Sequence, residues 1–133
     1  MANDVSLVEK FYAKLLNLSV TGSCEEGWLG IELGEMQILY FKSDYEIEKL
    51  QEWAWQPGYR AGAGNLTSWG LEFEENDFQK VVGNFQATAA ESLYQRPDWR
   101  RDKYWGFTVK DPMGNTIELY TVPKESPGNK EWV

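Results

Sequence analysis

Residues 111–119 read Asp-Pro-Met-Gly-Asn-Thr-Ile-Glu-Leu, which has the form of a tight turn leading into a β-strand. Pro112 presets φ for the turn, and Gly114 can supply a positive φ. After the turn, polar and apolar residues alternate, so alternate side chains point to opposite faces of a sheet. The segment predicts a hairpin whose second strand turns Glu118 away from the apolar core.

Working upstream from this hairpin, the sequence predicts a strand at Ser68–Glu74 and a helix at about Asp77–Ala89. Asn76 and Gln79 resemble a capping box at the start of that helix. Its apolar residues recur at i, i+3, i+4 and i+7, which gives one buried face; they are Phe78, Val81, Val82 and Phe85. Further strands are expected near Ser92–Arg96, Tyr104–Lys110 and Asn115–Val122.

The first half of the chain shows a similar pattern. A helix is expected at residues 6–16, with Ser6 and Glu9 as a capping box. Three strands follow, separated by turns at Gly27 and Gly34; they are roughly Ser19–Glu25, Trp28–Leu33 and Met36–Phe41. The order of one helix and then three strands therefore occurs twice in the sequence.

This duplication predicts a single α+β domain in which two βαβββ modules form a curved mixed sheet, shaped as a cup. The expected boundaries are about 1–44 for module one, 45–67 for a connector, 68–122 for module two and 123–133 for an irregular tail. Within the connector, Tyr45–Trp55 could form a short helix. Only three residues precede Asp4, so the first strand is expected to be absent or vestigial. The resulting sheet gap, covered by a partner chain or the tail, favours a homodimer.

Three segments resemble the vicinal-oxygen-chelate superfamily of glyoxalases, bleomycin-resistance proteins and extradiol dioxygenases. The turn and strand at 111–119 match the family's final hairpin. Asp4, Phe11-Tyr12 and Leu16 match its first helix, and residues 71–75 resemble the strand that opens its second half. The resemblance covers nearly the whole chain and implies the cup fold described above.

The resemblance also implies a metal site with one ligand from each of four strands. Carried over to this chain, the ligand positions fall on Glu118, on Ser68 where the family normally has His, and near Tyr40; the first would lie before Asp4. The chain contains no histidine, which excludes His-based metal sites and His-dependent nucleophilic catalysis. We therefore expect no bound metal and no cofactor.

The composition limits the partners. A formal charge of −8 argues against nucleic acid, which needs a basic surface. No apolar run is long enough for a membrane span and no signal segment is visible, so a cytoplasmic protein without a membrane partner is expected. The single cysteine, Cys24, excludes an internal disulfide.

Alternation predicts the side chains that line the cup and could contact a ligand. They are Glu118, Tyr40, Glu72, Thr108, Tyr120 and Ser68, with Trp55 from the connector as a further candidate. Arg100 and Arg101 are expected in a solvated turn, which leaves only Lys110 as a basic residue on the inner face. An acidic, aromatic cup favours a neutral or cationic aromatic ligand.

These expectations favour a metal-free small-molecule binding protein of the bleomycin-resistance type, which the resemblance associates with sequestration of a cationic drug. Two alternatives stay open. One is a glyoxalase- or dioxygenase-like enzyme, and the other is a degenerate domain with a structural or partner-binding role. Under the leading hypothesis, replacing Glu118 by Gln should weaken a cationic ligand and leave the fold intact.

Overall fold

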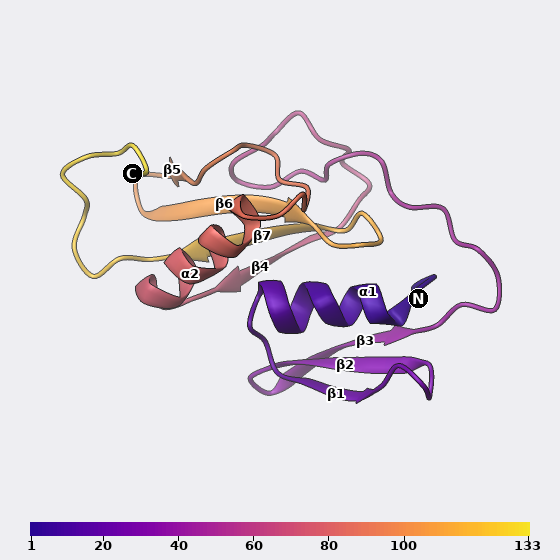
Figure 1. Cartoon of the computed structure of the whole chain (residues 1–133). Helices are drawn as coiled ribbons and strands as arrows, with labels where there is room; N and C mark the ends of the chain where they lie inside the picture. The colour runs from indigo at the N-terminus through magenta and orange to yellow at the C-terminus, as the bar shows by residue number, and fades with distance from the viewer. The chain divides into compact units, whose positions relative to one another are not determined.

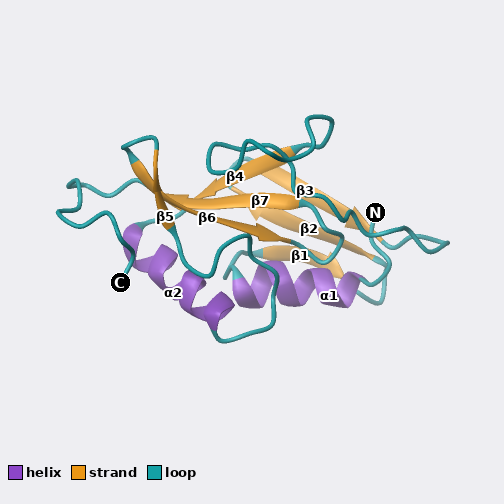
Figure 2. Ribbon diagram, turned by 90° about the horizontal axis from the view of Figure 1, so that it is seen from above, coloured by secondary structure: helices purple, strands orange, loops and turns teal.

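The computed structural model describes all residues from Met1 to Val133, and they form two compact units, Met1–Leu50 and Gln51–Val133. The division falls inside the expected connector. Each unit consists of a β-sheet with a helical segment on one face (Figures 1 and 2). The α+β class predicted from the sequence is confirmed. No helix in the chain is both long and apolar enough to cross a bilayer.

The helical segment of the first unit begins as α1 (Val5–Glu9) and continues as the π-helical turn η1 (Lys10–Leu15). Asp4 is the N-cap, and its carboxylate accepts a hydrogen bond from the Ser6 amide at 2.9 Å. The predicted Ser6–Glu9 capping box is therefore wrong, because the N-cap lies two residues earlier and the Ser6 hydroxyl itself donates to the Asp4 carboxylate at 2.6 Å.

Three antiparallel strands complete the first unit in the order β1-β2-β3; they are β1 (Val20–Ser23), β2 (Trp28–Leu33) and β3 (Met36–Phe41). Gly27 and Gly34 have positive φ in the intervening turns, as the sequence predicts. The helix buries Val8, Phe11 and Tyr12. Near the N-terminus, the backbone of Ala2 makes one parallel bridge to Lys42 beside β3.

The second unit is a four-stranded mixed sheet in the order β4-β7-β6-β5. Its elements are β4 (Ser68–Glu72), α2 (Glu75–Gln86), β5 (Asp98–Arg100), β6 (Tyr104–Lys110) and β7 (Thr116–Thr121). The β4–β7 pair is parallel and the other pairs are antiparallel. The four apolar residues predicted for the α2 face are all buried, and the ring of Phe85 packs edge-on to Phe107 at 5.8 Å.

Two local predictions in this region are wrong. The N-cap of α2 is Glu74 without a side-chain hydrogen bond, so Asn76 and Gln79 form no capping box. The segment Ser92–Arg96 is not a strand, because only Ser92 makes a bridge, to Val109; the strand begins later, after Pro97. Proline cannot donate to a sheet ladder, which fits its place just before β5.

The predicted helix at Tyr45–Trp55 is also absent, and this stretch is loop. The Asn3 side chain accepts from the Ile47 amide and donates to the Ile47 carbonyl, both at 2.7 Å. Bonds to distant groups thus replace the local hydrogen bonds of a helix.

The C-terminal tail packs onto the second unit. Glu131 forms a bridge with Asp98, and the Trp132 ring packs edge-on to Phe78 and Trp105, with centroids 5.5 and 5.2 Å away. The tail therefore covers the β5 edge of the second sheet.

Candidate functional site

The candidate site lies on the face of the second sheet that points away from α2. Phe107, Ile117 and Leu119 are buried in the apolar core, as predicted, and the intervening side chains point to the other face. The sheet register places Thr108 beside Glu118 and Tyr120 beside Glu72. Four predicted side chains are therefore brought to one face, and Ser68, at the start of β4, belongs to the same set.

A buried arginine occupies the centre of this face. Arg100 is only 3% exposed, and its Nη1 donates to Glu118 at 2.8 Å, Thr108 at 3.0 Å and Gln56 at 3.1 Å. Its Nε and Nη2 donate to the Asp98 carboxylate at 2.9 to 3.2 Å. One guanidinium thus joins two carboxylates in a single network.

This finding corrects the expectation that Arg100 lies in a solvated turn. The turn takes the next two residues, Arg101 and Asp102, which have positive φ and are exposed. Because Arg100 is the last residue of β5 and pairs with Tyr104, its side chain shares the face of Tyr104 and Glu118. The inner face therefore carries a second basic residue besides Lys110.

Tyr104 supplies a further hydrogen bond to the same carboxylate. Its hydroxyl donates to the two Glu118 oxygens at 3.1 and 3.3 Å. Burial, followed by the charge of Glu118 and the hydrogen bond to it, raises the pKa of Tyr104 from 10.0 to about 12. The phenol is therefore a neutral donor at physiological pH and a poor general base.

We expect Tyr104 to titrate late, near its pKa of about 12, and to lower the stability of the folded protein in base. Folding raises its pKa, so unfolded chains lose the proton while folded chains still hold it, and stability falls as pH rises from 10.0 towards about 12. Absorbance at 295 nm during an alkaline titration should show this late step, and Tyr104→Phe should remove it. An unchanged titration curve for Tyr104→Phe would contradict the assignment.

The second part of the connector lies directly on the site. The Ala54 amide donates to Thr116 Oγ1 at 2.9 Å, and Ser68 Oγ donates to the Trp55 carbonyl at 3.0 Å. Lys110, 4% exposed, donates to the Gln51 carbonyl at 2.6 Å, with its ammonium 4.6 Å from the centre of the Trp53 ring. These contacts close the Ser68–Thr116–Lys110 end of the face, while the Trp55 side chain is 53% exposed.

The opposite end of the face remains open to solvent. Tyr120 is half-buried and its ring packs edge-on against Tyr104 with centroids 5.4 Å apart, while neighbouring Glu72 is exposed. Burial, followed by the charges of Glu72 and Glu118, raises the pKa of Tyr120. Tyr120 and Glu72, together with the exposed Trp55 beyond the other end of the face, are thus the predicted site residues that a ligand could reach.

Tyr40 does not lie where the sequence predicted. In the first unit it is buried against the helical segment, with its hydroxyl 3.0 Å from that of Tyr12 and the two ring centroids 5.7 Å apart. The prediction that the Tyr40 side chain points into the cup is therefore wrong, and the opposite face of β3 is taken by the residues on either side of it. Its neighbours Leu39 and Phe41 point to the opposite face and are 48% and 49% exposed.

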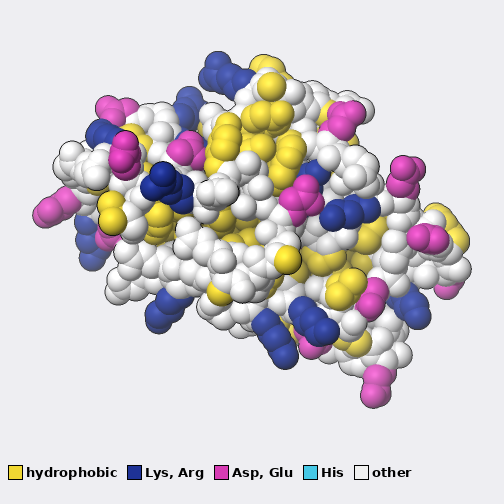
Figure 3. All heavy atoms as spheres, turned by 45° about the horizontal axis from the view of Figure 1, so that its top comes forward, with side chains coloured by type: hydrophobic (Ala, Val, Ile, Leu, Met, Phe, Trp, Pro, Cys, Tyr) yellow, Lys and Arg dark blue, Asp and Glu magenta, His cyan; other side chains and the backbone are white.

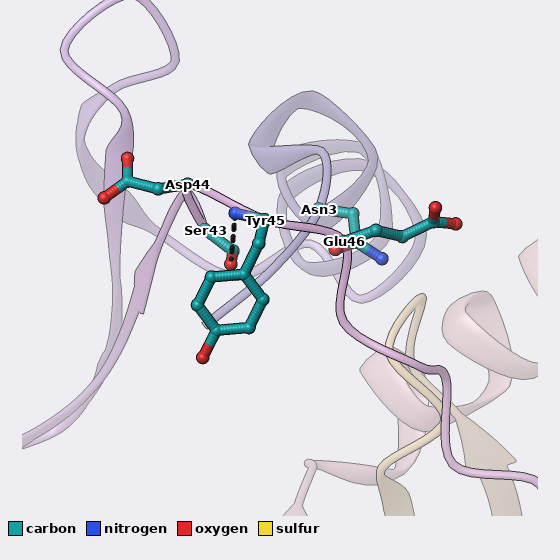
Figure 4. A pocket seen from close by; sticks show the side chains of 5 residues that line it. All are labelled: Asn3, Ser43, Asp44, Tyr45 and Glu46. Atoms are coloured by element: carbon teal, nitrogen blue, oxygen red, sulfur yellow. Dashed lines mark hydrogen bonds between the residues drawn. The ribbon is translucent and has the colours of Figure 1, made fainter.

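The first unit also carries a shallow depression of about 330 Å³, shown in Figure 4. It is lined by Asn3, Ser43, Asp44, Tyr45 and Glu46. The Ser43 hydroxyl accepts from the Tyr45 amide at 3.2 Å, and the Asn3 amide is bonded to Ile47. The Ser43 and Asn3 side chains therefore hydrogen-bond to the backbone of the loop that forms the depression, and their polar groups already have partners within the protein.

The residues present do not fit the metal site that the family resemblance implies. Glu118 is bonded to Arg100 and Tyr104, Ser68 is bonded to the connector, and Tyr40 faces a helix. No three His, Cys, Asp or Glu side chains lie together in a way that could hold a metal ion. The carried-over ligand positions are therefore bonded to other parts of the protein.

The structure resembles many solved structures. It matches a glyoxalase/dioxygenase from Nostoc punctiforme with a TM-score of 0.69 and 12% identity, over 92% of this chain and 86% of that one. It also matches a fosfomycin resistance protein from Mesorhizobium loti, with a TM-score of 0.62 and 12% identity, over 92% of this chain and 86% of that one. This chain has the vicinal-oxygen-chelate fold.

A lactoylglutathione lyase from Agrobacterium tumefaciens shares this vicinal-oxygen-chelate fold with a TM-score of 0.57 and 17% identity, over 90% of this chain and 87% of that one. No family model matches the sequence, and no curated protein matches it. At these identities the likeness concerns the fold, as the three sequence segments had predicted.

Proposed function

We propose that this protein is a metal-independent small-molecule binding protein on a vicinal-oxygen-chelate scaffold. The observation that carries the proposal is the state of Glu118, whose carboxylate accepts from Arg100 and Tyr104. The carboxylate needs no metal ion to offset its charge, because a guanidinium does so from within the protein. The face nevertheless keeps a half-buried aromatic group, Tyr120, and an exposed acidic group, Glu72.

The charge balance favours a neutral or cationic ligand. Arg100 faces both Asp98 and Glu118, which leaves one negative charge in the network, and Glu72 adds another at the open end. An aromatic cation could stack on Tyr120 while its charge lies near Glu72, with about 0.5–2 kcal/mol from each such aromatic contact. On the face that Figure 3 shows, acidic and basic side chains are scattered among hydrophobic ones.

An enzymatic role has less support at this site. Glu118 is held by two donors, and Tyr104 with a pKa of about 12 keeps its proton at neutral pH. Neither group is positioned as a free acid or base for a substrate. The arrangement of these side chains therefore agrees better with binding of a ligand than with catalysis on it.

Binding can be tested by titrating the protein with matched aromatic ligands, one cationic, one neutral and one anionic, and by following tryptophan fluorescence and heat. We expect the cationic ligand to bind most tightly, with an affinity unchanged by added Zn²⁺ or a chelator. Glu72→Gln and Tyr120→Leu should each weaken it by roughly 2- to 30-fold, the equivalent of about 0.5–2 kcal/mol.

Matched controls are Glu25→Gln and Tyr94→Leu, which change exposed residues outside this face and should leave affinity unchanged. Preference for the anionic ligand, or dependence of binding on metal, would refute the proposal.

We also propose that the chain forms a homodimer. Leu39 and Phe41 are apolar and exposed on the face of β3 opposite to Tyr40, and this supports a contact surface for a second copy of the chain. Light scattering at micromolar concentration should give the mass of a dimer, and Leu39→Lys should shift it towards the monomer. A monomeric mass for the unaltered protein would exclude this assembly.

A further inference from the structure

We propose that Arg100 is a built-in cation that holds the second-unit site together, so that removing its side chain creates a binding site for free guanidinium. The inference concerns the carboxylate network and does not depend on the ligand proposed above. Three observations carry it: the charges around Arg100, the shape of its surroundings, and the directions of its hydrogen bonds.

The charges require a cation at this position. Glu118 is only 8% exposed and accepts from Nη1 of Arg100, while Asp98 accepts from Nε and Nη2. A buried carboxylate without a counter-charge is strongly disfavoured. Arg100 bonds to both carboxylates within one side chain, at 2.8 Å to Glu118 and 2.9 Å to Asp98.

The surroundings leave room for a guanidinium and little else. A Cβ at Gly58 would lie 2.1 Å from Arg100 Cζ, and a Cβ at Gly106 would lie 2.5 Å from Arg100 Cδ. Gly58 comes from the connector and Gly106 from β6, so two separate segments lack a side chain where they meet Arg100. Any larger residue at either position would fill the space that the guanidinium needs.

The acceptors match a planar, forked cation. Five oxygen atoms lie within 3.2 Å of the three guanidinium nitrogens: both carboxylate oxygens of Asp98 and one oxygen each from Gln56, Thr108 and Glu118. They are spread over Nε, Nη1 and Nη2, as a guanidinium requires. An ammonium group could satisfy fewer of them from one point.

The test uses the full-length variant Arg100→Ala and measures its melting temperature in increasing guanidinium chloride, at constant ionic strength adjusted with NaCl. At low millimolar concentrations guanidinium should raise the melting temperature of this variant and lower or leave unchanged that of the unaltered protein. The rise should follow the logarithm of the guanidinium concentration, as expected for a ligand of the folded state. Arg96→Ala, at an exposed position, is the matched control and should show no rise.

A second variant tests where the guanidinium binds. In Arg100→Ala combined with Glu118→Gln, the apparent affinity for guanidinium should fall about ten-fold or more, because a charge-assisted hydrogen bond is lost. No rise for Arg100→Ala, or an equal rise for Arg96→Ala, would overturn the proposal. If Arg100→Ala does not fold alone, guanidinium must restore its folding where equal NaCl does not, and failure to do so would also overturn it.

A stabilising effect of metal ions would contradict the proposal. Zn²⁺, Ni²⁺ or Mn²⁺ should not raise the melting temperature of the unaltered protein, because Arg100 already faces Glu118. A metal-dependent rise that is lost in Glu118→Gln would show that a metal can take the place of the guanidinium, and would refute Arg100 as the resident cation. Loss of aromatic ligand binding alone would refute only the proposed function.

Discussion

Replacing Glu118 by Gln is expected to lower the free energy of unfolding by about 3 kcal/mol, because it leaves part of a buried ion pair uncompensated. Arg100 keeps Asp98 as a partner, which places the loss at the lower end of the usual range for such pairs. For a chain of this length the melting temperature should fall by roughly 10 °C. This reverses the expectation from sequence that Glu118→Gln would spare the fold, since that expectation did not include the buried arginine.

The measurement is urea unfolding followed by tryptophan fluorescence, with Glu72→Gln as the control. Glu72 lies on the same face but is exposed, so its replacement should change the free energy of unfolding by less than about 0.5 kcal/mol. Equal stabilities for the Glu118→Gln and Glu72→Gln variants would mean that the Glu118–Arg100 contact contributes nothing.

Replacing Gly106 by Ala is expected to cost about 3 kcal/mol, at the upper end of the range for overpacking. The added Cβ would lie 2.5 Å from Arg100 Cδ and 2.7 Å from Nε. Gly106 is in β6 between two paired strands, so the backbone cannot easily move, and the guanidinium is fixed by its acceptors.

Gly83→Ala is the matched control, because an added Cβ there meets nothing within 4 Å. In the interior of α2, alanine should instead stabilise the protein by about 1 kcal/mol. The cost of Gly106→Ala should also largely disappear in the Arg100→Ala background, which a double-mutant cycle of urea unfolding would reveal. An undiminished cost in that background would assign the effect to the strand and not to Arg100.

Much of the fold was accessible from the sequence because local and periodic signals agree. Strands Trp28–Leu33, Met36–Phe41 and Tyr104–Lys110 have the predicted bounds. The helix predicted at Tyr45–Trp55 is absent because the backbone of Ile47 bonds to the distant Asn3 side chain and not to neighbouring residues. The prediction for Tyr40 was also wrong, because the inward direction was assigned by analogy to a ligand position and not by the burial of that strand.

The sequence by itself determined the α+β class, the face on which Glu118, Thr108 and Tyr120 lie, and the lack of any histidine ligand. These follow from side-chain periodicity and composition, which are properties of the chain alone. Only the tertiary structure decided that Arg100 neutralises Glu118, because their contact joins β5 to β7 across β6. Gln56, from the connector, accepts a hydrogen bond from the same guanidinium. Charge pairing between segments distant in sequence depends on strand order and on the path of a loop, and neither has a local sequence signal.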